Sequence, residues 1–196
     1  TASVHYGDTV LAEGLEVELE ENVGGPFTKS GPGTLMLMAT NTWCGATIVK
    51  DGVLTAGTDG AIPPATRLVL DGGTIDLGGF DFSFAGISGS GGTVVGGTAK
   101  IAGEWVVDGA ELATNRMMKS FTTVSGDVEI EPGSRMRITG FDELDGAKVY
   151  RILRMAQGTL SGVENLVCDL PHGWRLLRSA SGLAISKVKS VTVIVR

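Results

Sequence analysis

Residues 29–57 read KSGPGTLMLMATNTWCGATIVKDGVLTAG. Three short apolar runs, TLMLM, ATIV and VLTA, lie between glycine-containing turns in this stretch. Side chains that alternate with a period of two share one face of a pleated strand, so such a run predicts a short strand with one face toward a core. Glycine supplies the left-handed backbone that tight turns require. The stretch therefore predicts several short β-strands joined by tight turns.

The same pattern extends outward from this stretch along the chain. Glycine-containing breaks recur at residues 56–60, 71–73, 88–92 and 96–97, with short apolar runs between them. The chain contains 30 glycines in 196 residues, whereas glycine is about 7% of an average protein. The best helix candidate, residues 107–119, lacks a good cap. The sequence therefore predicts an all-β fold, and turn spacing alone leaves a solenoid of short coils and an antiparallel sandwich equally open.

The residue order within 29–57 resembles the autotransporter-associated β-strand repeat, also called the passenger-associated transport repeat. That family's pattern leads from a lysine through two glycines into a threonine-leucine strand, then through an asparagine, an aromatic residue and a glycine to a second strand and a Gly-x-Leu turn. The matching positions are Lys29, Gly31, Gly33, Thr34, Leu35, Leu37, Asn41, Thr42, Trp43, Gly45, Ile48, Gly52 and Leu54. The sequence departs from the pattern at Trp43, Cys44 and Ala46, where the family usually has tyrosine, serine and glycine. Residues 60–94 resemble the stretch that commonly follows this repeat.

The resemblance implies an all-β, right-handed parallel β-helix and so favours the solenoid over the sandwich. We expect residues 1–102 to form the coils, which contain the repeat at 29–57. Residues 103–196 are expected to form a C-terminal β-rich cap, because the glycine repeats thin out there and longer alternating runs follow. Open strand edges at the end of such a stack need a cap. The residues expected to define the repeat structurally are Gly31, Gly33, Thr34, Leu35, Asn41, Gly45 and Gly52.

In function, the resemblance implies a non-enzymatic structural or adhesin-like passenger module of a bacterial surface or secreted protein. Such a module lies outside the cell or on its surface, with the export signal outside this sequence. Host or environmental glycans, surface proteins and further repeats of the parent chain are the expected partners. A formal charge of −6 disfavours nucleic acid, and no apolar run reaches the roughly 18 residues of a membrane helix. Nucleic-acid binding and membrane insertion by this segment are therefore not expected.

A glycan-binding module is the first alternative function. Trp43, Trp105 and Trp174 could act as stacking platforms for sugar rings. Tryptophans scattered through a strand-rich chain more often belong to the core or to a cap, because a large apolar ring gains most from burial. The sequence leaves both roles open for these three residues.

A β-helix polysaccharide lyase or hydrolase is the enzymatic alternative. Asp71, Asp76 and Asp81 follow one another at intervals of five residues, and Asp59 lies upstream. Carboxylates stacked on one face could hold calcium or act as an acid–base pair. However, Asp71 precedes a glycine, as turn residues do, and only Arg67 is near enough in sequence to act as the base. The sequence therefore predicts that the protein is not an enzyme and has no catalytic residues.

Histidine and cysteine give no sign of a cofactor or metal site. His5 and His172 have no metal-ligand type of residue at the usual spacing beside them, so no metal or cofactor is expected. Cys44 and Cys168 lie far apart in the sequence, which leaves open whether they form a disulfide or remain two thiols. A bridge between them would close a long loop and could contribute about 4 kcal/mol.

Overall fold

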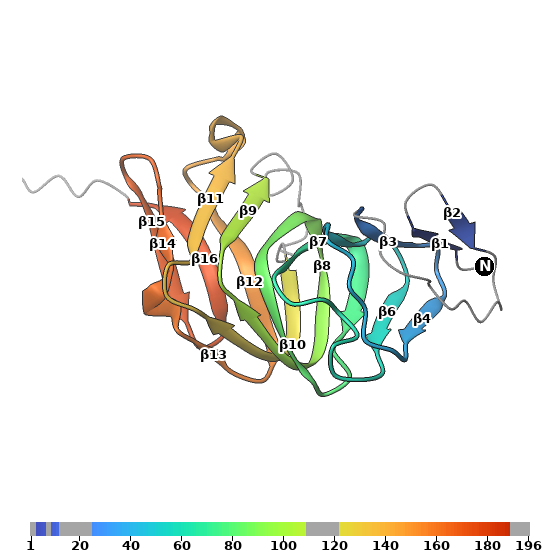
Figure 1. Ribbon diagram of the computed structural model, residues 1–196. Coiled ribbons are helices and arrows are strands. Elements are labelled where there is room, and N and C mark those ends of the chain that lie inside the picture. The colour runs from blue at the N-terminus through green and yellow to red at the C-terminus, as the bar shows by residue number, and fades with distance from the viewer. Residues whose placement is uncertain (1–2, 7–8, 12–24, 109–121, 189–196) are drawn as a thin grey trace, which may run out of the picture.

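A computed structural model describes residues 3–6, 9–11, 25–108 and 122–188 of the chain (Figure 1). Strands make up most of these residues, and the helical segments among them are two short 3-10 turns, η1 (Phe141–Glu143) and η2 (Val163–Asn165). The prediction of an all-β fold is confirmed. The helix candidate at 107–119 lies almost wholly outside the described residues.

The strands fall into a large sheet and a small one. The large sheet contains thirteen of the described strands, in the order β15-β16-β12-β10-β8-β7-β5-β3-β1-β2 with β4, β6 and β13 paired to members of this series, and the small sheet has the order β14-β11-β9. The strand bounds are β1 (Ser3–Tyr6), β2 (Thr9–Leu11), β3 (Phe27–Ser30), β4 (Thr34–Leu37), β5 (Thr47–Val49), β6 (Val53–Ala56), β7 (Thr66–Asp76), β8 (Asp81–Ile101), β9 (Glu104–Asp108), β10 (Thr122–Ile130), β11 (Arg135–Thr139), β12 (Val149–Gln157), β13 (Leu160–Ser161), β14 (Val167–Cys168), β15 (Trp174–Ser179) and β16 (Gly182–Lys187).

Parallel pairing with a regular offset joins β3 to β8. Phe27 pairs with Thr47, and Thr47 pairs in turn with Leu68, which are offsets of 20 and 21 residues. The second row of strands repeats this spacing, because Thr34 pairs with Val53 and β6 continues onto β7. Each turn of chain therefore places its strands directly against those of the turn before it.

The offset lengthens beyond β8. Thr122 pairs with Gly92, and Leu153 pairs in turn with Thr122, which are offsets of 30 and 31 residues. The small sheet follows the longer spacing, since Arg135 pairs in parallel with Glu104 on one side and with Val167 on the other. Parallel pairing thus continues past residue 103, with about ten more residues in each turn of chain.

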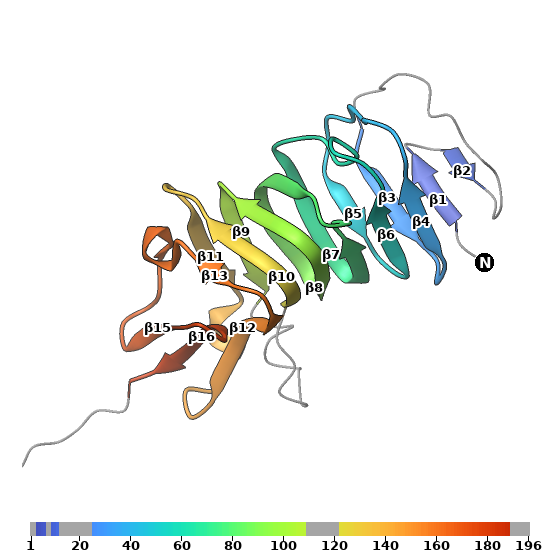
Figure 2. The same ribbon diagram turned by 90° about the horizontal axis from the view of Figure 1, so that it is seen from below.

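The large sheet is mixed rather than purely parallel. At its N-terminal end β1 pairs antiparallel with both β2 and β3. At its C-terminal end β12, β16 and β15 form an antiparallel group, which lies at the far end of the molecule in Figure 2. Antiparallel strands therefore flank the parallel series at both ends.

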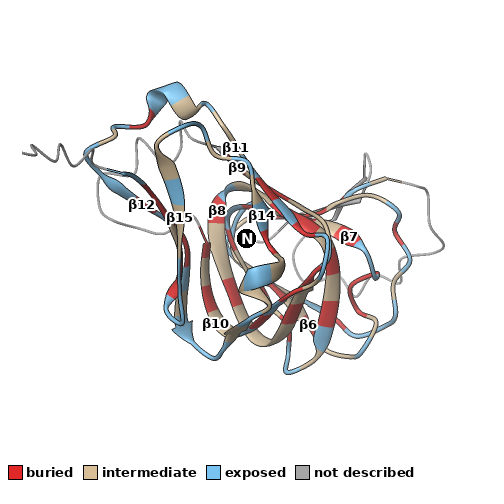
Figure 3. Cartoon of the chain, turned by 90° about the vertical axis from the view of Figure 1, so that its left-hand side faces the viewer, coloured by how far each residue is buried: buried red, intermediate tan, exposed pale blue. Residues whose placement is uncertain are grey.

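The core runs along the inside of the stacked strands. Alternate side chains of β7 and β10 are largely buried, as the period of two predicts, and buried residues recur along the strands in Figure 3. The largest apolar side chains that are fully buried are Phe27, Leu54, Ile62, Leu68, Leu70, Ile75, Leu77, Phe84, Ile87, Ile101 and Trp105. Each such side chain contributes about 1.5–3 kcal/mol by burial, so this continuous core is the main source of stability.

Candidate functional site

Lys29, the first residue of the repeat-like stretch, has a structural rather than a chemical role. Its side chain is buried, and its ammonium donates hydrogen bonds to the carbonyl oxygens of Ser30, Gly31 and Asp51 at 3.1, 2.7 and 3.0 Å. Burial lowers the pKa of Lys29, and the nearby charge of Asp51 acts in the opposite direction. The lysine therefore ties β3 to the turn that follows β5 across the strand stack.

Gly52 lies directly against this ammonium group. Its φ is 64°, in the left-handed region that favours glycine. A Cβ at this position would lie 2.3 and 2.5 Å from the carbonyl oxygens of Gly33 and Gly31, and 2.8 Å from Nζ of Lys29. The Gly-x-Leu turn of the repeat therefore needs glycine here both for its backbone and for its space.

Gly45 and Asn41 hold neighbouring turns of the chain together. A Cβ on Gly45 would lie 2.6 Å from the backbone nitrogen of Pro26, so glycine permits the close approach. The side-chain amide of Asn41 donates to the carbonyl oxygens of Ala39 at 2.8 Å and Ala61 at 2.9 Å, twenty residues further along the chain. This one side chain thus links two successive turns of chain.

The remaining repeat positions have simpler roles. Gly31 has a left-handed φ of 77°. Thr34 begins β4 and is exposed, whereas Leu35 is half-buried and packs against the core. The carbonyl oxygen of Gly33 accepts a hydrogen bond from the backbone nitrogen of Val53 at 3.1 Å. None of these groups is placed for chemistry beyond packing and hydrogen bonding.

Trp43 lies in the core and not on the surface. Its ring stacks on Phe27 with centroids 4.5 Å apart, and its Nε1 donates to the hydroxyl of Thr47 at 3.0 Å. The hydroxyls of Thr47 and Thr66 lie 3.1 Å apart, and Thr66 donates to the carbonyl oxygen of Gly45 at 2.8 Å. This buried chain of hydrogen bonds satisfies the polar groups that the stacked aromatic pair brings into the core.

The other two tryptophans differ in exposure. Trp105 in β9 is fully buried, so neither Trp43 nor Trp105 offers a ring face to a sugar, which corrects the stacking role considered for these two positions. Trp174 at the start of β15 is half-buried, and its ring packs edge-on against Phe141 with centroids 5.0 Å apart. Tyr150 lies on another side of the same ring at 6.3 Å. All three indoles therefore serve the core or its edge.

Each of three aspartates considered for catalysis is bound to nearby groups. Asp71 accepts hydrogen bonds from the backbone nitrogen and hydroxyl of Ser90 at 2.9 and 3.4 Å. Asp76 accepts one from the backbone of Gly78 at 2.9 Å, and Asp81 forms an ion pair with Lys100 at 3.4 Å. Within the described residues, no group of three or more His, Cys, Asp or Glu side chains could hold a metal ion.

The two cysteines are not joined to one another. Cys44 is exposed, and its thiol donates to the carbonyl oxygen of Thr42 at 3.8 Å. Cys168 is half-buried, and burial raises the pKa of its thiol to about 11. A thiol with so high a pKa is protonated at neutral pH and is a poor nucleophile.

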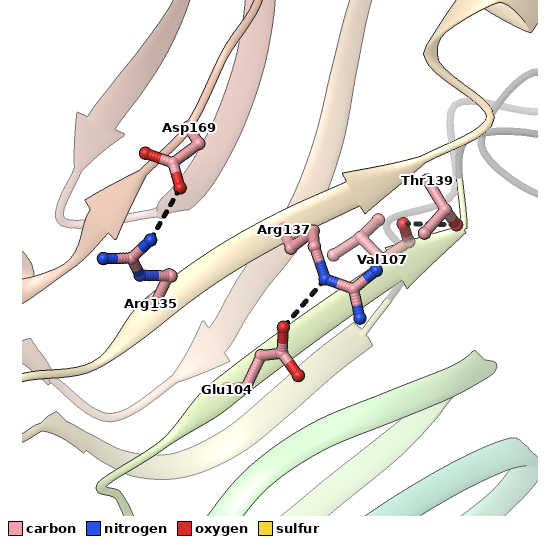
Figure 4. A network of polar contacts seen from close by, with 6 residues as sticks. All are labelled: Glu104, Val107, Arg135, Arg137, Thr139 and Asp169. Atoms are coloured by element: carbon pink, nitrogen blue, oxygen red, sulfur yellow. Dashed lines mark hydrogen bonds and ion pairs between the residues drawn. The ribbon is translucent and has the colours of Figure 1, made fainter.

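Exposed charged side chains of the small sheet form a network that was not predicted from the sequence (Figure 4). Arg137 in β11 donates through Nε to Glu104 in β9 at 2.8 Å, and Arg135 donates through Nη1 to Asp169 at 2.9 Å. Hydrogen bonding and the charge of Arg137 hold the pKa of Glu104 below its ordinary value. Such exposed pairs contribute little to stability, but they neutralise both arginines on this face.

A stretch of 81 residues, 40% of this chain, is 42% identical to part of a much longer known protein. That protein is the adhesin BmaC autotransporter of Brucella suis biovar 1 (strain 1330). The chain spans about 2% of the length of this adhesin. No family model matches the sequence, and no solved structure matches it.

The geometry and the comparison agree on a coarse description. The chain is all-β and is partly similar to an autotransporter adhesin. In the parts of the chain that the structure describes, no helix is long and apolar enough to cross a membrane. Most of the described side chains that the sequence singled out pack in the core or form hydrogen bonds with the backbone, and Asp81 forms an ion pair with Lys100.

Proposed function

We propose that this chain is a non-enzymatic, adhesin-like passenger module of a bacterial surface or secreted protein, located on the cell surface or outside the cell. The observation that carries the proposal is the 42% identity over 81 residues to an autotransporter adhesin. The continuous apolar core and the local engagement of Asp71 and Asp76 agree with a structural module.

The finer fold in this proposal is a right-handed parallel β-helix that contains the autotransporter-associated repeat at 29–57. Three observations support it. The parallel offset is 20 or 21 residues from β3 through β5 to β7, Lys29 and Gly52 meet at one corner, and Asn41 links successive turns of chain. In this description residues 1–102 are the coils and residues 103–196 the β-rich C-terminal cap, in whose first part the parallel pairing continues.

Adhesion can be tested with beads coated with the purified chain. We expect coated beads to bind mammalian cells or immobilised extracellular matrix more than beads coated with the heat-unfolded chain or with albumin. Equal binding by the native chain and by both control coatings would overturn the adhesin-like role. Far-UV circular dichroism of the native chain, with a strand-dominated spectrum, confirms that a negative result comes from a folded protein.

The absence of enzymatic activity is part of the same proposal and needs its own assay. The chain is incubated with polygalacturonate and other uronic-acid polymers, and new reducing ends and unsaturated products are measured. We expect no turnover. Activity that disappears in both Asp71→Ala and Asp76→Ala, while each variant keeps its fold, would replace the proposal with a polysaccharide-cleaving enzyme.

A further inference from the structure

The antiparallel group β12–β16–β15 has one face on the core, and its opposite face has exposed side chains on the two outer strands. Tyr150 and Leu153 of β12 pair with Ile185 and Leu183 of β16, and all four are buried. The register shifts between Arg151 and Leu153, which leaves the buried Ile152 as an extra residue of β12. The exposed residues Val149, Arg151 and Arg154 point to the opposite side of the sheet. That opposite side is called here the arginine face, and it consists of three levels of Cα partners. These levels are Val149–Ser186–Arg175, Arg151–Ala184–Leu177 and Arg154–Gly182–Ser179.

The arginine face has long side chains on its two outer strands and small ones in the middle. The central strand β16 contributes only Gly182, Ala184 and Ser186, whereas Arg151 and Arg154 stand on β12 and Arg175 stands on β15. All three arginines are exposed. Their positively charged groups therefore border a strip of small, uncharged residues at the C-terminal end of the molecule, where Figure 2 shows these strands.

Among the described residues, no acid balances the charges of these arginines. No ion pair within the described part of the chain involves Arg151, Arg154 or Arg175. The three levels contain no carboxylate, and on the next strand, β10, the partner of Arg154 is Thr123. Arg135 and Arg137 of the small sheet differ in this respect, because each is paired with a carboxylate. The arginine face is thus a positive patch on a chain whose formal charge is −6.

The spacing of the arginines suits an extended polymer with separated anionic groups. Strands lie about 4.8 Å apart and residues rise about 3.4 Å along them. Arg151 and Arg154 stand on neighbouring levels, three residues apart on β12 and opposite residues two apart on β16, so their Cα atoms are separated by roughly 7–10 Å. Arg175 lies roughly 12 Å from Arg151. A guanidinium presents its donors in a rigid fork that matches a carboxylate or a sulfate. A small anion would contact one arginine, whereas a chain with charges at intervals would contact all three.

Other anionic partners fit the arginine face less well. Its three levels carry no aromatic side chain, so a single-stranded nucleic acid would find no stacking platform. Nucleic acid also brings a charge on every nucleotide toward a protein of net charge −6, which repels it. Anionic membranes are bound by clusters of about four to eight basic residues, more than the three here.

We propose that the arginine face binds an anionic polysaccharide, with Arg151, Arg154 and Arg175 holding its carboxylate or sulfate groups. The inference rests on the proposed surface function, to which it adds a class of ligand. It requires none of the tryptophans, and it places the binding surface on the antiparallel group rather than on the parallel strands.

The test compares two double variants of the full chain in binding to immobilised polygalacturonate. Arg151→Gln/Arg154→Gln removes two arginines from the arginine face, and Arg135→Gln/Arg137→Gln removes two from the face where acids neutralise them. By biolayer interferometry we expect the first to weaken binding by at least about tenfold and the second by less than about twofold, with neutral dextran not bound at all. The salt dependence of binding should also become shallower in the first variant only.

Several outcomes would overturn the inference. It fails if the wild-type chain binds no anionic polysaccharide, if both double variants lose equal affinity, or if only anionic vesicles or single-stranded DNA are bound. Matching circular dichroism spectra and unfolding midpoints exclude misfolding of the variants. Bead adhesion distinguishes failure of this inference from failure of the proposed function. Unchanged adhesion by Arg151→Gln/Arg154→Gln would reject the anionic polysaccharide as the ligand of adhesion and leave the adhesin-like function standing. No adhesion by the wild-type chain would reject the adhesin-like function itself.

Discussion

At the scale of single residues, Gly52 and Gly79 separate two reasons for using glycine. Both have left-handed φ angles, 64° and 86°, but a Cβ at position 52 would meet two carbonyl oxygens whereas a Cβ at position 79 would meet nothing within 4 Å. Left-handed strain alone costs about 1–2 kcal/mol. We expect Gly79→Ala to lower the free energy of unfolding by that amount and Gly52→Ala to lower it clearly further, as measured by urea denaturation. Equal losses would show that the backbone angle alone matters at position 52.

The buried ammonium of Lys29 leads to a second prediction at this scale. Lys29→Met leaves the carbonyl oxygens of Ser30, Gly31 and Asp51 without this donor, so we expect a loss of about 1–3 kcal/mol in the free energy of unfolding at pH 7. The measurement is urea denaturation, with Lys50→Met on the exposed surface as the control. A loss no larger than that of the control would contradict the role of Lys29.

The difference in the free energy of unfolding between the wild type and Lys29→Met should depend on pH, and the direction of that dependence can be predicted. Burial lowers the pKa of Lys29 in the folded state below its ordinary value of 10.5, so the unfolded chain binds more protons in the alkaline range below 10.5. Stability therefore rises with pH through that window in the wild type relative to Lys29→Met. Urea denaturation at intervals from pH 8 to pH 10.5 measures the difference. A difference that falls with rising pH would mean that the three carbonyl groups outweigh the effect of burial.

At the scale of strands, the parallel register makes a prediction that an antiparallel sandwich does not. Met36 in β4 and Thr55 in β6 are Cα partners. Adjacent strands lie about 4.8 Å apart, within the range of Cα separations that a disulfide spans. We expect Met36→Cys/Thr55→Cys, in a background with Cys44 and Cys168 changed to serine, to form a disulfide under mild oxidation. The bond is detected by mass spectrometry of tryptic peptides.

In the matched control, the cysteine in β6 is placed at position 53 instead of position 55. Val53 pairs with Thr34, two residues before Met36, so Met36→Cys/Val53→Cys should oxidise much more slowly. Equal rates for the two pairs would mean that β4 and β6 do not hold this register.

The positions of short strands were predicted well from the sequence, but the extent of the long strand β8 was not. The runs TLMLM, ATIV and VLTA correspond to β4, β5 and β6, because period-two alternation is a local signal. The glycine-rich breaks at 88–92 and 96–97, in contrast, lie inside the single strand β8, where pairing with β7 and β10 continues through register shifts. Gly89, Gly91, Gly96 and Gly97 still have positive φ angles there, so the predicted changes of direction occur inside one paired strand rather than between strands.

Surface patches were beyond the reach of sequence reasoning. The ion pairs of the small sheet join residues 33 and 34 positions apart, and the arginine face joins β12 to β15 through β16. Predicting the ion pairs or the arginine face requires knowing how many residues separate paired strands. That separation lengthens beyond β8, and no sequence repeat indicates the change. Burial of Trp43 was one of the two roles that the sequence left open, but its partners Phe27 and Thr47 could not be predicted, because they come from neighbouring turns of chain.

At the scale of the whole molecule, stacked strands contact mainly their neighbours, so distant changes should act independently. Asn41 lies between β4 and β5, and Trp174 begins β15, six pairing steps from β5 in the large sheet, which is roughly 29 Å. We expect the losses of stability in Asn41→Ala and Trp174→Ala to add in the double variant to within about 0.5 kcal/mol. A urea double-mutant cycle measures the coupling, and a coupling above about 1 kcal/mol would point to a more global core than the stacked arrangement provides.

The longer offset beyond β8 has a practical consequence for engineering. Each turn of chain there is about ten residues longer than the turns before it, yet the strands remain paired in parallel, so the stack accepts additional residues between strands. The tight connection at Pro132 and Gly133, between β10 and β11, is exposed, and a Cβ on Gly133 would meet nothing within 4 Å. A foreign peptide grafted at this connection should leave every strand register intact. The protein thus offers a position at which an epitope could be displayed without redesign of its scaffold.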